Sequence, residues 1–206
     1  MKWLPALIVL CLTASIARAD MVDTSGMEPW EVCGLCHGLE GVSPMPRFPH
    51  LAGQRPDYIE KQFRDFRHGR RRNDGGQMET VTMEIEAGAL ARIATYFAEQ
   101  PPPPPAPKKG PRFEQGRELF LHGRSALGAC ADCHGPSARP TGIDAPRLEA
   151  QHRDYLVKQL SDFADGMRSN DPDGIMQTVA AALKPAEREA LADYLAATER
   201  RERDFK

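Results

Sequence analysis

Residues 33–38 read CGLCHG, and 97 positions further along the chain residues 130–135 read CADCHG. The repetition extends past these motifs, since 13 of the 26 positions from 49 to 74 are identical to those from 146 to 171. One inserted residue then changes the offset to 98, which aligns Met78 with Met176 and Tyr96 with Tyr194. Chance does not produce such agreement, so the sequence predicts a tandem duplication of one small domain.

Apolar residues recur at helical spacing in both copies. The pattern predicts a helix over residues 57–69 with a counterpart over 154–166, and another over 90–97 with a counterpart over 185–195. The second copy also has a leading helix, whose equivalent in the first copy must be short or absent. This leading helix is marked by Phe113, Gly116, Leu119 and Phe120. No convincing alternation of apolar and polar residues occurs, and we therefore expect an all-α protein.

The composition excludes two classes of protein. With 27 Lys and Arg against 29 Asp and Glu in 206 residues, the chain lacks the basic excess of a nucleic-acid-binding protein. A mean hydropathy of −0.51 excludes a protein with many membrane spans. The only strongly apolar stretch, residues 4–17, follows Lys2 and precedes Ala19, which predicts a secretory signal peptide over residues 1–19. We favour this signal peptide, and therefore export, over an N-terminal membrane anchor.

A proline-rich segment separates the two copies, because residues 101–111 read PPPPPAPKKGP. Such a run favours the polyproline II conformation and acts as a semi-rigid spacer. A plain domain linker is the simplest interpretation, and a separator of fixed length between two functional sites is the alternative.

The two Cys-x-x-Cys-His motifs carry the chemistry. In an exported protein this motif is the attachment signature of c-type haem, because cysteines three positions apart on a helical turn present their sulfurs to the two vinyl groups. The adjacent histidine then becomes the proximal ligand of the iron. Covalent attachment also retains a large cofactor on a domain of about 80 residues. The expected attachment residues are Cys33, Cys36, Cys130 and Cys133, and the expected proximal ligands are His37 and His134.

Two other interpretations of the motifs are weaker. A zinc site needs about four nitrogen or sulfur ligands, whereas each copy offers two cysteines and one histidine nearby. A thioredoxin-like redox pair needs a βαβ context, which the sequence lacks.

The second ligand of each iron is expected to be a methionine. Met78 follows His37 by 41 residues, and Met176 follows His134 by 42. Each precedes a Thr-Val pair between the middle and the last helix, on a segment able to fold over the opposite face of the haem. A methionine at such a place is often only core packing, but these two are the methionines that match between the copies. Sulfur ligation favours ferrous iron, raises the reduction potential and leaves no open coordination position.

The remaining histidines do not repeat between the copies, so we interpret them as surface or structural residues. They are His50, His68, His122 and His152. We interpret the basic run at residues 70–72 as a solvated face, with docking of an acidic partner as the alternative, although Arg71 does repeat as Arg168.

Together these residues resemble the dihaem class I cytochromes c, and specifically the cytochrome c4 family. The resemblance rests on the CxxCHG motifs, the P-x-L-x-x-Q segments, the G-x-R-x-N-D turns, the repeated methionine and the closing tyrosine helix. It implies a signal peptide (1–19), two cytochrome c domains (20–100 and 112–206) and the linker (101–111) between them. It also implies that Cys33, Cys36, His37 and Met78 serve one haem, and that Cys130, Cys133, His134 and Met176 serve the other. The short start of the first copy and the proline-rich linker depart from the family pattern, so the packing of the two domains stays open.

The resemblance implies a periplasmic electron carrier that does no bond-making chemistry itself. Its expected partners are a donor dehydrogenase or reductase complex and a terminal oxidase, which it meets by transient association. The alternative is a dihaem electron-accepting subunit held tightly by a dehydrogenase of sulfur compounds. A dihaem peroxidase needs an exchangeable ligand at one iron, and a methionine present in both copies argues against that class.

Overall fold

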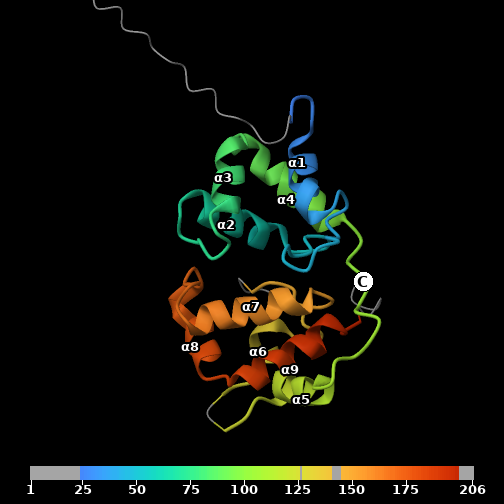
Figure 1. Ribbon diagram of the computed structural model, residues 1–206, viewed down its shortest axis with the longest axis vertical. Helices are drawn as coiled ribbons and strands as arrows, with labels where there is room; N and C mark the ends of the chain where they lie inside the picture. The colour runs from blue at the N-terminus through green and yellow to red at the C-terminus, as the bar shows by residue number, and fades with distance from the viewer. Residues whose placement is uncertain (1–23, 126, 141–144, 200–206) are drawn as a thin grey trace, which may run out of the picture.

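The computed structural model describes residues 24–125, 127–140 and 145–199, so the expected signal peptide at 1–19 lies outside it. Every regular element in these ranges is a helix, and the one isolated bridge joins Arg124 and Leu127. The expectation of an all-α protein is therefore confirmed. Figure 1 shows two helical halves, one above the other, with the proline-rich segment running between them along one side. No helix within the described ranges has the length and apolarity of a membrane span.

The α-helices follow the same order in the two halves, apart from an additional first helix in the second half. The first half contains α1 (Pro29–His37), α2 (Pro56–Arg67), α3 (Gln77–Glu84), the short turn η1 (Ala87–Ala89) and α4 (Leu90–Glu99). The second half contains α5 (Phe113–His122), α6 (Ala131–His134), α7 (Arg153–Ala164), the turn η2 (Pro172–Gly174), α8 (Ile175–Ala181) and α9 (Pro185–Ala196). The expected helices at 57–69 and 154–166 correspond to α2 and α7, which begin one residue earlier and end two residues before the glycine. Those at 90–97 and 185–195 correspond to α4 and α9.

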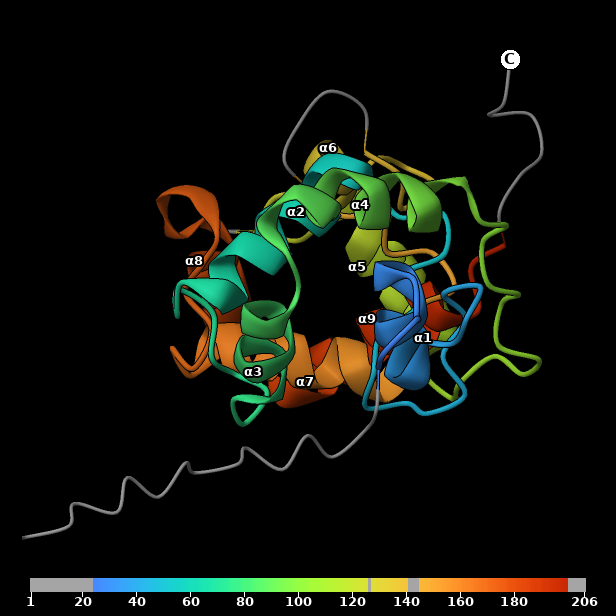
Figure 2. The ribbon, with the colours of Figure 1, turned by 90° about the horizontal axis from the view of Figure 1, so that it is seen from above.

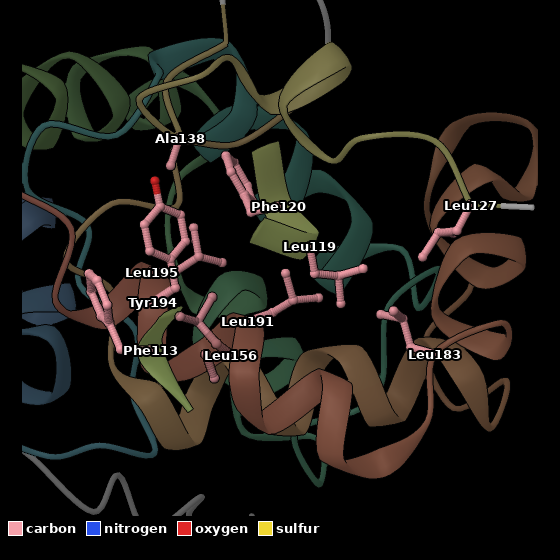
Figure 3. Packing of buried hydrophobic residues seen from close by; sticks show 11 residues of the cluster. Phe113, Leu119, Phe120, Leu127, Ala138, Leu156, Leu183, Leu191, Tyr194 and Leu195 are labelled. Carbon is pink, nitrogen blue, oxygen red and sulfur yellow. The ribbon is translucent and has the colours of Figure 1, made fainter. Parts of the chain in front are cut away.

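Each half has its own apolar core, formed by the faces that the periodicity predicts. In the first half Ile59 and Phe63 of α2 meet Ile93 and Phe97 of α4, and Phe97 is fully buried. In the second half α5, α7 and α9 enclose a cluster around Phe120, which is also fully buried (Figure 3). Complete burial of one such side chain stabilises the fold by about 1.5–3 kcal/mol. The apolar stripes therefore need no cofactor to account for their spacing.

The leading helix α5 explains a difference between the halves. It crosses α9 closely at Gly116, where a Cβ atom would collide with the carbonyl oxygen of Ala190. The ring of Tyr194 then lies 5.4 Å from that of Phe113. In the first half Trp30 of α1 stacks on Tyr96, the counterpart of Tyr194, at 5.0 Å. A single indole thus covers the tyrosine that a whole helix covers in the second half.

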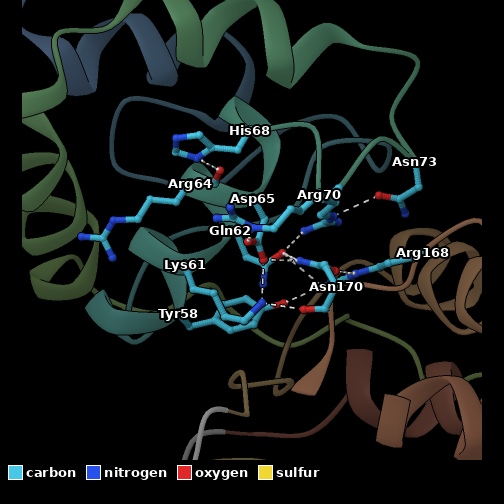
Figure 4. A network of polar contacts seen from close by, with 11 residues as sticks. Tyr58, Lys61, Gln62, Arg64, Asp65, His68, Arg70, Asn73, Arg168 and Asn170 are labelled. Atoms are coloured by element: carbon cyan, nitrogen blue, oxygen red, sulfur yellow. Dashed lines mark hydrogen bonds and ion pairs between the residues drawn. The ribbon is translucent and has the colours of Figure 1, made fainter. Parts of the chain in front are cut away.

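The halves pack against each other through a hydrogen-bond network with two-fold symmetry, and Figure 4 shows the part of it around Gln62, Arg168 and Asn170. Arg71 donates to the hydroxyl of Tyr155 at 3.0 Å, and its counterpart Arg168 donates to the hydroxyl of Tyr58 at 3.0 Å. Each guanidinium also donates to Gln62 of the first half and to Gln159 of the second half. The bond from Arg71 to Gln159 is 2.9 Å long. The packing that the sequence left open is therefore a close and polar interface.

The symmetry extends along the interface to two further glutamines. The side chain of Gln54 accepts from the backbone nitrogen of Arg147 at 2.9 Å and donates to the carbonyl of the same residue at 3.0 Å. Gln151 makes the same pair of bonds with His50, at 2.9 and 3.0 Å. The imidazoles of His50 and His152 contact each other across the interface at a tilt of 33°, with ring centroids 3.8 Å apart. These two histidines are structural residues of the interface. Of the two roles expected from the sequence, surface or structural, they have the structural one.

The interpretation of residues 70–72 as a solvated face is wrong for one of the three arginines. Arg71 is only 5% exposed because it points into the other half, whereas the side chain of Arg72 is 69% exposed. Arg70 lies between these extremes and donates to Asp65 at 2.7 Å. The central arginine is thus a buried contact between the halves.

Candidate haem sites

The first motif lies on the last turns of α1. Pro29 occupies the first helical position, and Glu28 and Glu31 form a capping box that starts the helix. Cys33 and His37 are four positions apart and Cys36 is three positions after Cys33, so the helix places all three side chains toward one side. The Sγ of Cys33 lies 3.4 Å from the carbonyl oxygen of Pro29.

The proximal histidine is oriented by a backbone carbonyl. His37 is buried, and its Nδ1 lies 2.9 Å from the carbonyl oxygen of Pro49. Burial lowers the pKa of His37 below its ordinary value, which keeps the imidazole neutral. With Nδ1–H donating to the carbonyl, Nε2 carries the lone pair that a metal requires. The residue is therefore prepared to act as an iron ligand.

The second half repeats this arrangement on a shorter helix. Cys130 is the N-cap of α6, and His134 is its last residue. His134 is buried, and its Nδ1 lies 3.2 Å from the carbonyl oxygen of Pro146, the counterpart of Pro49. Burial lowers the pKa of His134 as well. The repeated proline was the sequence signal for this contact, but its role became evident only from the structure.

The backbone conformation and close contacts require a glycine directly after each motif. Gly38 and Gly135 have φ angles of 81° and 75°, in the left-handed region. A Cβ atom at Gly38 would also collide with the carbonyl oxygen of Val42, and one at Gly135 with that of Arg139. The chain can therefore leave the helix directly after the histidine and return across it.

None of the four cysteines of the motifs forms a disulfide bond. Burial raises the pKa of Cys33 to about 11 and that of Cys130 to about 11, so both are uncharged at neutral pH. In the part of the chain that the structure describes, no three His, Cys, Asp or Glu residues gather in a way that could hold a metal ion. Among these residues the zinc interpretation therefore lacks a ligand set, whereas two cysteines followed by one histidine fit a haem that brings its own four nitrogen ligands.

The two methionines occupy equivalent places on α3 and α8. Each is the second residue of its helix, and each is only partly buried. The backbone nitrogen of Met78 donates to the carboxylate of Asp74 at 2.6 Å, and that of Met176 donates to Asp171 at 2.6 Å. The repeated aspartate therefore starts the helix that carries the methionine, a role that the sequence pattern signalled only as repetition.

In each half the motif histidine and the repeated methionine lie on different helices. α1 packs on α4, whereas α3 packs on α2. Figures 1 and 2 both place α3 and α1 on different sides of the first half. The second half also keeps the two apart, since α6 packs on the leading helix α5 whereas α8 packs on α7. The assignment of the methionines therefore rests on their repeated position.

Two buried cations at the interface also fit a cofactor that carries carboxylates. The side-chain partners of Arg71 and Arg168 are amide and phenol oxygens, such as Gln62 at 2.7 Å from Arg71. Among the described residues no carboxylate lies within ion-pair distance of either guanidinium. A buried cation without a counter-ion is costly, and haem carries two propionate groups. The residues present therefore fit haem in both their donor chemistry and their charge.

Comparison with known proteins agrees with these sites. A family model described as cytochrome c matches residues 113–199. The chain is 40% identical to cytochrome c4 of Thiocapsa roseopersicina over 169 residues, covering 80% of this chain and 85% of that protein. It is 36% identical to the thiosulfate dehydrogenase electron acceptor of Thiomonas intermedia, covering 80% of this chain and 77% of that protein. The structure resembles reduced cytochrome c4 from Pseudomonas stutzeri with a TM-score of 0.73, at 36% identity over 82% of this chain and 94% of that one.

Proposed function

The chain belongs to the cytochrome c4 family, and on that basis we propose that it carries single electrons between a donor dehydrogenase or reductase complex and a terminal oxidase. It is an electron carrier rather than an enzyme, with two covalently attached haem c groups as its cofactors. The iron of each haem supplies the redox chemistry by cycling between the ferrous and ferric states.

The residues of this chain would divide the work as follows. The thiols of Cys33 and Cys36 would bind the haem of the first half, and those of Cys130 and Cys133 the haem of the second half. His37 and His134 would hold the irons through Nε2, since their Nδ1 atoms are engaged by proline carbonyls. Met78 and Met176 would supply the sulfur ligands. With both axial positions filled, neither site would bind oxygen or peroxide.

The same proposal assigns the regions of the chain. Residues 20–100 form the first cytochrome c domain, residues 101–111 the linker and residues 112–206 the second domain. The order of helices supports this division, because α1–α4 and α6–α9 repeat one arrangement. Residues 1–19 act as a signal peptide that delivers the protein to the periplasm, which is supported by the apolar stretch at 4–17.

The observation that carries the proposal is the histidine geometry shared by the halves. In each half the motif histidine is buried, neutral and bonded through Nδ1 to the carbonyl of the equivalent proline, Pro49 or Pro146. The test is a visible spectrum of the purified protein, oxidised and reduced, before and after carbon monoxide. We expect two haems per chain, the methionine–iron charge-transfer band and no binding of carbon monoxide. High-spin iron at neutral pH, or carbon monoxide bound at one haem, would overturn the closed-carrier assignment.

A second candidate function is that of an electron-accepting subunit held by a thiosulfate dehydrogenase. It is favoured by the similarity to the Thiomonas intermedia protein of that name. Purification from the native host separates the candidates, because a dedicated subunit would copurify with its dehydrogenase at a fixed ratio. A carrier would instead emerge alone and would accept electrons from more than one donor.

A further inference from the structure

The large apolar side chains that the structure leaves exposed are concentrated around the first motif. Four of the seven among the described residues fall within an eleven-residue stretch that contains the end of α1 and the loop after it. Leu39 is 61% exposed and Leu35 is 50% exposed. We call these four residues the first-motif patch: Leu35, Leu39, Val42 and Met45.

The residues of the patch are held close to the motif by specific contacts. The Cδ2 atom of Leu39 lies 2.9 Å from the place of a Cβ on Gly34, so Leu39 folds over the helix beside Leu35. The hydroxyl of Tyr96 donates to the carbonyl of Leu39 at 3.0 Å and fixes this position. The hydroxyl of Ser43 lies 3.2 Å from the carbonyl of Cys36 and 3.1 Å from that of Met45. These contacts hold Leu39 against α1 and tie the loop at Met45 to the second cysteine of the motif.

The fold itself does not require an apolar surface here. In the second half the counterparts of Leu35, Leu39 and Val42 are Asp132, Pro136 and Arg139. Arg139 forms an ion pair with Glu149 at 3.2 Å. The same turn thus carries an aspartate, a proline and an arginine in one half and three exposed apolar side chains in the other. Exposed apolar surface that is dispensable for the fold is typical of a contact site for another molecule.

The charges at the edge of the patch indicate what kind of molecule binds there. Glu31 and Glu40 are the charged residues within and beside the patch on the helix and the loop. The nearest basic side chain in sequence, Arg47, is directed away, since it donates to Gln77 of α3 at 3.2 Å and covers the ring of Phe48. An anionic membrane surface would be repelled by this acidic edge. A protein with an apolar face and a basic rim would fit it.

We propose that the first-motif patch docks a redox protein that presents an apolar face with a basic rim, and that the first half is therefore the one that exchanges electrons with this partner. The inference rests on the proposed electron-carrier function and names one of its surfaces. In the docked pair one electron leaves the reduced carrier and enters the oxidised partner, with no other reactant. The second half, with Asp132 at the matching position, does not offer this surface.

The experiment compares two oxidants of the reduced, haem-loaded protein by stopped flow. The probe is a mitochondrial-type cytochrome c with a basic rim, and hexacyanoferrate(III) serves as an oxidant that needs no apolar docking. Leu35→Ser with Leu39→Ser should lower the second-order rate constant with the probe about tenfold, which corresponds to about 1.4 kcal/mol. The rate with hexacyanoferrate(III) should stay within about twofold of the wild-type value.

A matched control lies on the other half. Met167, which is 68% exposed, is changed to serine and should leave both rates unaltered. An equal loss with Met167→Ser, or no loss with the double variant, overturns the proposal. Binding of wild-type protein to phosphatidylcholine vesicles that the double variant loses, while the probe rate is unchanged, assigns the patch to lipid and also overturns it. Failure of the wild-type protein to reduce hexacyanoferrate(III) would instead contradict the proposed function.

Discussion

The symmetric interface predicts a large effect for the replacement of Arg71 by leucine. The guanidinium makes four side-chain hydrogen bonds, at 2.7 to 3.0 Å, and two of them reach the other half at Tyr155 and Gln159. A hydrogen bond that involves a charged group contributes about 1.5–3 kcal/mol, so the two bonds across the interface contribute about 3–6 kcal/mol. Leucine relieves the burial cost of the cation, which offsets part of this loss. We therefore expect a net loss of about 3 kcal/mol.

The assay is urea unfolding of the haem-loaded protein, followed by far-ultraviolet circular dichroism and by the Soret band. Arg71→Leu should lower the free energy of unfolding and separate the unfolding of the two halves into two transitions. Arg72→Leu is the matched control, because its side chain is exposed and its one ion-pair contact, with Glu79, is 3.9 Å long. This control should change the free energy of unfolding by no more than about 0.5 kcal/mol.

Two results would refute the reasoning. If Arg71→Leu is no more destabilising than Arg72→Leu, the buried contacts across the interface make no net contribution to the free energy of unfolding. If it is destabilising but the halves still unfold together, Arg71 supports its own half and does not couple it to the other. Arg168→Leu should reproduce the effect of Arg71→Leu, because Arg168 makes the symmetric contacts with Tyr58 and Gln62.

Three further predictions concern other parts of the molecule. Met78→Ala should let carbon monoxide bind one haem per chain, seen in the reduced visible spectrum, whereas Met83→Ala, at an exposed position, should not. Burial, and then the neighbouring imidazole across the interface, lowers the pKa of His50 to about 4, below its unfolded value near 6.5. The stability that depends on neutral His50 is therefore complete above pH 6.5 and is lost as the pH falls toward 4, and His50→Gln should flatten this part of the urea midpoint profile. Gly116→Ala should destabilise the second half by about 3 kcal/mol in thermal unfolding, because its Cβ meets the backbone of α9, whereas Gly88→Ala meets no atom and should have little effect.

Periodicity and repetition predicted most of the fold because both depend on residues that are close together in the sequence, such as the buried face of one helix or the spacing within one motif. The stripes at 57–69 and 90–97 are buried where the helical period places them, at Ile59, Phe63, Ile93 and Phe97. The motif histidines were identified because covalent haem attachment fixes residue type and spacing within one helical turn. The length of chain before Cys33 also predicted that a leading helix of the first half is short or absent, and none lies between residue 24 and α1. Its replacement by Trp30 did not, because one aromatic residue in a short segment has no periodicity.

The interface could not be predicted from the same patterns. A run of three arginines carries no information about which side chain turns toward a distant part of the chain, so the charge pattern suggested solvent for Arg71. The stronger signal was the repetition of Arg71 as Arg168. Repetition by itself did not distinguish a residue that each half needs internally from one that joins the halves. The structure separates the two cases, since Tyr58 and Tyr155 bond across the interface whereas Phe63 packs within its own half.

The symmetry of the interface accounts for which residues the two copies share. In a two-fold interface each side chain meets the counterparts of its own neighbours, so Gln62 and Gln159 each accept from both Arg71 and Arg168. A change in one copy therefore disturbs contacts of both copies, which keeps this surface alike in the two halves. The outer turn of each motif has no such constraint, and there Leu35 stands opposite Asp132 in the alignment of the copies. The two copies therefore keep the same residues at the interface and differ at the outer turn of the motif. A carrier needs this combination if its halves must stay joined while only one of them meets the partner.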